Sequence, residues 1–208
     1  MKLEGQHIFK GPREAVWEML RDPDALSTAI PGAQELKKLS DQEFEGVINL
    51  RMGPVSGSFS GKVTLSNEVA PSSFTLTAEG RGAPGFAKGV GDAELFDQGD
   101  GTTLMKYTGE MQIGGMLASV GQRMVDSVAK SMFRQGFEAM DNTLAAKLAG
   151  KSVEDIKSIK SPTEAQFAAG VAKDMVKDVT GKPLGKILMY AIPIIVIIVL
   201  AVILISRF

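Results

Sequence analysis

Few side chains in this sequence have the chemistry of catalysis or metal binding. The 208 residues include one histidine, His7, and no cysteine, which excludes disulfides, cysteine-ligated clusters and a cysteine nucleophile. A single histidine without cysteine also argues against a nitrogen or sulfur metal site. The letters "GRGAPG" at 80–85 match GxGxxG, but a strand-like segment follows where a phosphate-binding helix is required. We therefore expect no metal and no enzyme activity, and interpret His7 as an ordinary strand residue.

Two polar residues, Ser131 and Gln135, interrupt the apolar side of a segment with helical periodicity. They lie one turn apart near the centre of the apolar arc, where side chains would face a sheet. Buried polar groups need partners. The pair therefore either bonds to backbone or buried water, or binds the polar head of a mostly apolar ligand. The arc itself contains Leu117, Gly121, Met124, Val128, Met132 and Ala139.

The order of the elements that would position these residues predicts an α+β fold. A strand, "KLEGQHIF", is followed by a short helix that begins near Pro12 and a second helical piece, "DPDALSTAIPGA". Residues 35–114 alternate with period two and predict about six antiparallel strands, and residues 115–148 have helical periodicity without proline. A sheet with one wet face must cover the other. We expect a curved antiparallel sheet around this long C-terminal helix.

Glycine occupies many of the positions that should face the helix. It contributes no packing in a strand, so these glycines indicate either strong curvature of the sheet or an apolar cavity, and both interpretations stay open. The inward glycines predicted by alternation are Gly46, Gly57, Gly61, Gly80, Gly82, Gly89, Gly91 and Gly109.

The C-terminal run "YAIPIIVIIVLAVILI", widened to residues 187–205, predicts a transmembrane helix. Its 19 apolar residues would reach about 28 Å, enough to span a hydrocarbon core. Four lysines precede the span and Arg207 alone follows it, which places the N-terminal part on the cytoplasmic face of the inner (cell) membrane, with a single-pass anchor. The four lysines are Lys173, Lys177, Lys182 and Lys186.

The chain is thus divided into a folded domain at 1–149, a linker at 150–186 and the anchor at 187–205. Within the linker, Pro162 begins a predicted helix that extends to about Val179, with apolar residues every four positions. This short amphipathic helix is either a plain tether or lies on the membrane surface. Nucleic acid is not an expected partner, since the net charge is −1 and basic residues are not interleaved with aromatic ones.

Several stretches resemble the CoxG family of carbon monoxide dehydrogenase subunits. They are "DPDALSTAIPGAQEL", "MGPVSGSFSGKVTL", "GRGAPGFAKGVGDAEL" and "YTGEMQIGGMLASVGQRMVDSVAKSMFRQGF", and the resemblance covers roughly residues 1–148. The family belongs to the START-like (SRPBCC) helix-grip superfamily, whose members enclose hydrophobic ligands between sheet and helix. The resemblance implies a protein that recruits molybdenum-containing carbon monoxide dehydrogenase, or a related hydroxylase, to the membrane and delivers its electrons to quinone.

From these observations we expect a cavity that binds menaquinone or ubiquinone and shuttles it between bilayer and dehydrogenase. The alternatives are a purely structural membrane-anchoring subunit and a lipid-transfer module. We expect Ile30, Phe86 and Met116 at the mouth of the cavity. The other predicted cavity residues are Leu50, Phe59, Leu76, Gly89, Tyr107, Met111, Leu117, Val120, Met124, Val128, Ser131, Met132 and Gln135.

Overall fold

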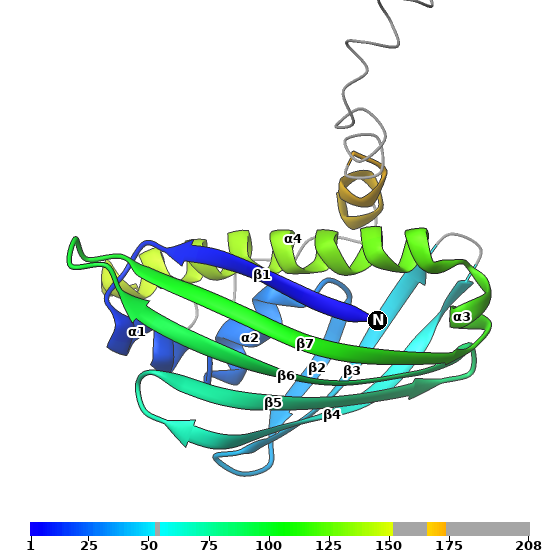
Figure 1. The fold of residues 1–208 in the computed structure, drawn as a ribbon, viewed down its shortest axis with the longest axis horizontal. Coiled ribbons are helices and arrows are strands. Elements are labelled where there is room, and N and C mark those ends of the chain that lie inside the picture. The colour runs from blue at the N-terminus through cyan, green and yellow to red at the C-terminus, as the bar shows by residue number, and fades with distance from the viewer. Residues whose placement is uncertain (53–54, 152–165, 174–208) are drawn as a thin grey trace, which may run out of the picture. The chain divides into compact units, whose positions relative to one another are not determined.

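The computed structural model describes residues 1–52, 55–151 and 166–173, and its contacts divide the chain into two units, Met1–Val171 and Ala172–Phe208. The strands and helices from β1 to α4 lie in the first unit, and Figure 1 shows their arrangement. In chain order they are β1 (Lys2–Phe9), α1 (Arg13–Met19), α2 (Pro23–Ala29), β2 (Ala33–Lys38), β3 (Glu43–Met52), β4 (Val55–Val69), β5 (Ser73–Gly82), β6 (Gly85–Asp97), β7 (Thr103–Gly115), α3 (Met116–Ser119) and α4 (Gln122–Leu148).

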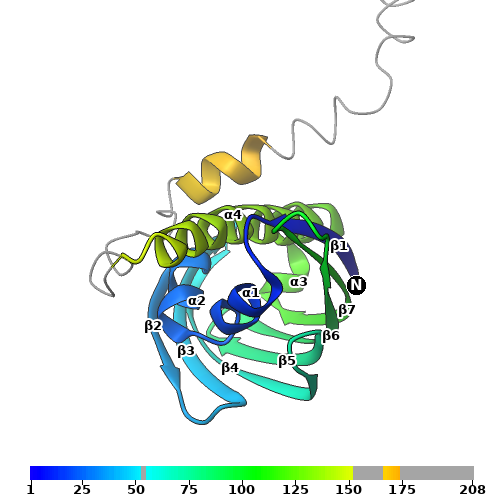
Figure 2. The same cartoon turned by 90° about the vertical axis from the view of Figure 1, so that its left-hand side faces the viewer.

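The seven strands form one antiparallel sheet in the order β1-β7-β6-β5-β4-β3-β2. Seen end-on, the sheet curls from β1 round to β2, and α4 lies across its open side (Figure 2). The predicted α+β fold, a curved antiparallel sheet with a long C-terminal helix, is confirmed.

The predicted helix at 115–148 is interrupted in the structure. α3 ends at Ser119 and α4 begins at Gln122. Gly121 between them has φ +88°, a left-handed backbone conformation that only glycine adopts at little cost. Helical periodicity did not reveal this break, because apolar spacing records which side chains face the core and says nothing of one backbone angle.

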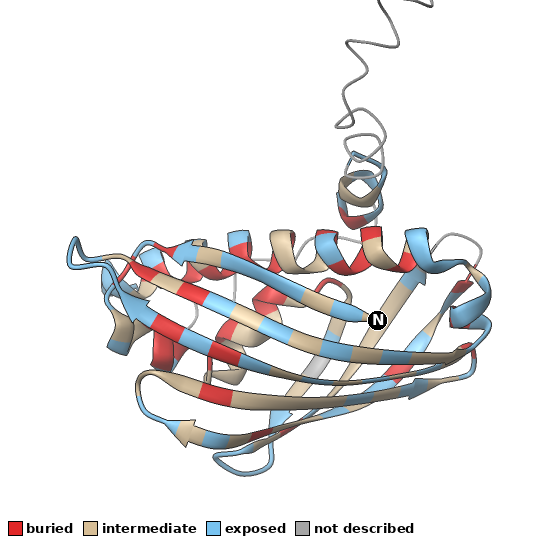
Figure 3. Ribbon diagram, in the orientation of Figure 1, coloured by how far each residue is buried: buried red, intermediate tan, exposed pale blue. Residues whose placement is uncertain are grey.

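Apolar side chains gather in two clusters towards the two ends of the concave face. The α1-end cluster joins α1, α2 and α4 to the sheet, and its buried members include Phe9, Val16, Trp17, Met19, Phe44, Leu65, Phe74, Leu95, Met105, Phe137, Met140 and Leu144. Burying each large apolar side chain contributes about 1.5–3 kcal/mol, so this cluster is the main stabilising core. In Figure 3 the buried stretches of β6 and β7 lie towards α1, and the half-buried stretches lie towards α3.

The short helices close the end of the sheet that holds this core. Asp22 caps α2 by accepting a hydrogen bond from the Asp24 amide (2.9 Å), and Pro23 opens the helix, as expected at a helix N-terminus. Thr28 of α2 bonds to Thr143 of α4 through their hydroxyls (3.0 Å). The Thr28–Thr143 hydrogen bond joins α2 to α4.

Beyond α4, residues 166–173 are helical and are called the trailing helix below. The described residues of the predicted 162–179 helix therefore have the expected conformation. No helix among the residues that the structure describes is long and apolar enough to cross a membrane. The predicted anchor at 187–205 lies outside those residues.

Candidate ligand-binding site

The candidate site is the second apolar cluster, called the α3-end cluster. Its members come from β3, β4, β7, α3, α4 and the trailing helix. The buried ones are Val55, Phe59, Leu117, Val125, Val128 and Phe167, and the partly buried ones are Met1, Ile48, Leu50, Met111, Ile113, Val120, Met124, Met132 and Val171. Four of these are methionines, whose unbranched side chains adapt to irregular apolar shapes.

Half of the predicted cavity residues meet in this cluster. They are Leu50, Phe59, Met111, Leu117, Val120, Met124, Val128 and Met132. Leu76 and Tyr107 instead pack against the α1-end cluster. Sequence reasoning missed Phe167 and Val171 as members, because their apolar spacing was assigned to a linker helix that is either a tether or lies on the membrane surface.

Between the two clusters the concave face is only half-buried. Leu76, Ala78, Gly80 and Gly89 keep intermediate exposure, although their strand positions alternate with outward polar residues. The middle of the concave face is therefore less completely buried than its α1 end.

The inward glycines serve two different purposes. A Cβ added at Gly61, Gly91 or Gly109 would lie 2.8–2.9 Å from a carbonyl oxygen of the neighbouring strand, so these positions need glycine for the close approach of curled strands. At Gly80 the nearest atom, the Ser60 carbonyl oxygen, would be 4.0 Å away, so a Cβ there would make only an ordinary van der Waals contact. Close approach of curled strands thus explains the glycines at 61, 91 and 109 but not the glycine at 80.

The polar pair Ser131 and Gln135 is buried, with exposed fractions of 0% and 8%. The Gln135 Nε2 donates a hydrogen bond to the Ser131 Oγ (2.8 Å). A Cβ on Gly170 of the trailing helix would collide with the Gln135 amide, so Gln135 lies under that helix on the flank of α4. The two side chains are thus hydrogen-bonded to each other, an arrangement that satisfies them without a ligand.

Aromatic rings line the seam where β1 and β7 meet α4. Tyr107 stacks on Phe133 with centroids 4.8 Å apart, and His7 stacks on Phe137 at 4.8 Å. Burial raises the pKa of the Tyr107 hydroxyl above its usual value. His7, predicted to be an ordinary strand residue, also bonds through Nε2 to the Asp141 carboxylate (2.9 Å) and so ties β1 to α4.

The three predicted mouth residues lie in different surroundings. Met116 is 59% exposed at the start of α3, and Ile30 is half-buried just before the buried Pro31. Phe86 differs from the prediction: it pairs with Gly114, and a Cβ on Gly114 would collide with its ring. Since the neighbouring Ile113 belongs to the α3-end cluster, Phe86 faces the opposite, outer side of the sheet.

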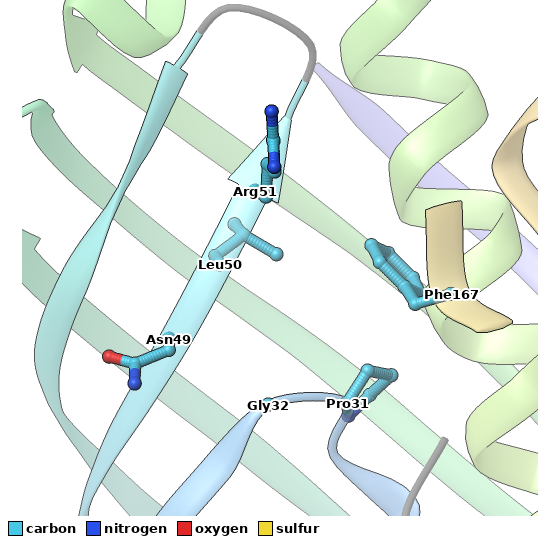
Figure 4. A pocket seen from close by; sticks show the side chains of 6 residues that line it. All are labelled: Pro31, Gly32, Asn49, Leu50, Arg51 and Phe167. Atoms are coloured by element: carbon cyan, nitrogen blue, oxygen red, sulfur yellow. The ribbon is translucent and has the colours of Figure 1, made fainter. Parts of the chain in front are cut away.

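Two cavities adjoin the end of β3. One, of about 10 Å³, is lined by Pro31, Gly32, Asn49, Leu50, Arg51 and Phe167 (Figure 4). The other, of about 290 Å³ and open to solvent, is lined by Asn49, Leu50, Arg51, Ser56, Gly57 and Ser58. Over the ranges that the structure describes, no three His, Asp or Glu residues gather as a metal site would require.

A curled antiparallel sheet gripped by one long helix is the START-like helix-grip fold. The chain belongs to the CoxG family of carbon monoxide dehydrogenase subunits, whose model matches residues 5–145. A search of curated proteins found no match to the chain.

Solved structures agree with this class. A conserved protein from Geobacillus kaustophilus is similar, with 28% identity and a TM-score of 0.67 over 70% of this chain and 95% of that one. A START superfamily protein from Mycobacterium smegmatis shares the fold at 12% identity and a TM-score of 0.53, covering 69% and 97% of the two chains. The Zhui aromatase/cyclase from Streptomyces sp. R1128 also shares the fold, at 12% identity and a TM-score of 0.52. The match covers 73% of this chain and 99% of that one.

Proposed function

We propose that this protein binds a quinone, menaquinone or ubiquinone, on its concave face and carries it between the membrane and a molybdenum-containing carbon monoxide dehydrogenase or related hydroxylase. In this role it is an accessory carrier and not an enzyme. The observation that carries the proposal is the half-buried apolar surface between the two clusters, in a chain that belongs to the CoxG family.

The chemistry of the site suits such a ligand. A quinone with an isoprenoid tail is largely apolar and needs an apolar wall with few polar contacts. The α3-end cluster supplies Met111, Met124 and Met132 as an adaptable wall.

Membrane attachment completes the proposal. The apolar run at 187–205 would hold the chain at the cytoplasmic face of the inner membrane. A quinone is almost insoluble in water, so its carrier must remain near the bilayer. A tethered domain meets that need and brings the dehydrogenase to the same surface.

The direct test is to identify what the protein binds. The full chain, purified from membranes in mild detergent, is extracted with organic solvent and the extract is analysed by mass spectrometry. We expect menaquinone or ubiquinone in near-stoichiometric amount, absent from a mock purification with the same detergent. Phospholipid in place of quinone would favour a lipid-transfer module.

A purely structural anchoring subunit is the second candidate. The glycines at 61, 91 and 109 favour it, because close approach between strands explains them without any ligand. This candidate predicts an extract without a stoichiometric small molecule, while the dehydrogenase still fractionates with membranes in the presence of the protein.

A further inference from the structure

The trailing helix places one aromatic ring in the candidate site. Phe167 is only 3% exposed and packs within the α3-end cluster, and Val171 packs beside it. Their neighbours Gln166, Ala168 and Ala169 are exposed. The segment 166–171 therefore presents one apolar face to the body of the first unit.

The fit of this segment is close. Gly170 lies against α4 so tightly that a Cβ would collide with the Gln135 amide and approach Arg134. Glycine inside a helix costs about 1 kcal/mol relative to alanine, and the close approach explains its presence here. Figure 4 shows the Phe167 ring facing Leu50, with Pro31 beside it. The cavity of about 10 Å³ left around the ring holds no more than about one water molecule.

We infer that residues 166–171 form an intramolecular plug, which occupies part of the apolar ligand site and must leave before a ligand can fill it. The inference rests on the proposed function, since it names a regulator of the same site. Leu50, Val128 and Met132 belong to the cluster that Phe167 completes. A ligand seated on these side chains would overlap the ring, so docking of the plug and binding of the ligand exclude each other.

Only molecules with the plug released can bind the ligand, so the apparent affinity equals the intrinsic affinity multiplied by the fraction of molecules with the plug released. It also shields methionine and leucine side chains that an empty site would expose to water. The plug is therefore part of the same chain as the site, and its release opens the site without rearrangement of the sheet.

A reversible cross-link tests docking and competition together. The sequence has no cysteine, so Gln135→Cys with Gly170→Cys introduces one possible intramolecular disulfide at a close contact. The full chain in detergent is oxidised or reduced, and binding of decyl-ubiquinone is measured by equilibrium dialysis against empty micelles. Gln135→Cys with Ala168→Cys, whose second position is exposed, is the matched control.

We expect the 135/170 pair to cross-link readily and the control pair poorly. The oxidised 135/170 protein should bind decyl-ubiquinone at least tenfold more weakly than the same protein after reduction. Independently, Phe167→Ala in the full chain should bind several-fold more tightly than the unmodified chain, and Ala168→Ser should not change the affinity. Circular dichroism verifies that each variant is folded.

The possible failures are distinguishable. If the 135/170 pair does not cross-link, the segment does not dock and the inference is overturned. Equal binding by the oxidised and reduced forms overturns competition but leaves the proposed function intact. If the unmodified, reduced and Phe167→Ala proteins all fail to bind quinone, the proposed function fails and the plug loses its ligand, although the cross-link still reports docking.

Discussion

Tyr107 makes the stability of the fold depend on pH in the alkaline range. Burial raises the pKa of its hydroxyl above 10.0, the ordinary value, so between the unfolded and folded pKa values the folded protein holds a proton that the unfolded chain has lost. The free energy of unfolding must then decrease as pH rises through this window. We expect the melting temperature to fall above about pH 10.

Tyr107→Phe is the control for this expectation. The variant keeps the ring that stacks on Phe133 but has no ionisable hydroxyl. Its melting temperature, followed by circular dichroism between pH 8 and 11, should fall less steeply than that of the unmodified protein. Parallel curves would show that other groups cause the alkaline loss.

Gly80 is a position on the concave face at which an added side chain should destabilise the fold least. A Cβ there meets no atom closer than 4.0 Å, whereas at Gly89 it would lie 3.3 Å from the Glu110 carbonyl oxygen. Gly80→Leu should therefore fold, at a cost of no more than about 1–3 kcal/mol, and should bind decyl-ubiquinone at least tenfold more weakly. Thr77→Leu, on the outer face of the same strand, should bind normally. Unchanged binding by Gly80→Leu would remove the concave face as the ligand site.

The curl of the sheet depends on glycines between neighbouring strands. Gly91 of β6 pairs with Gly109 of β7, and a Cβ on Gly109 would lie 2.8 Å from the Val90 carbonyl oxygen. Gly109→Ala should thus force the strands apart and destabilise the fold by about 1–3 kcal/mol.

Gly80→Ala is the matched comparison on another strand of the same sheet. It meets no close atom and should be neutral or stabilising by about 0.4–1 kcal/mol, because alanine restricts the unfolded chain more than glycine does. Urea unfolding curves of the two variants measure the difference. Equal destabilisation would mean that glycine in these strands matters for a reason other than close approach.

The segment after α4 completes the α3-end cluster but not the α1-end cluster. A fragment that ends at Lys160 should therefore fold, because the main core is intact. It should be less stable than a fragment that ends at Lys173 by about 1.5–3 kcal/mol, the contribution of one buried phenylalanine. Thermal unfolding followed by circular dichroism compares them. If the shorter fragment is unfolded, the main core requires the trailing helix.

Much of the fold could be predicted from the sequence because its signals are local. Period-two alternation in 35–114 placed β2 to β7, and proline and glycine marked their ends. The alternating positions also identified which strand residues face the helix, so Leu50, Phe59 and Met111 were correctly predicted to lie together. Strand and helix periods arise from backbone geometry within a few residues, and a single sequence records that geometry.

Only the tertiary structure decided what covers each surface. Phe167 was predicted to be in a linker helix and packs in the α3-end cluster, Phe86 lies on the outer face, and Gln135 lies against Gly170. The pairing of His7 with Asp141, 134 residues apart, has no local signal either. Amphipathic spacing shows that a residue has a buried side but not which distant segment buries it, because that choice depends on how the folded sheet and helix meet.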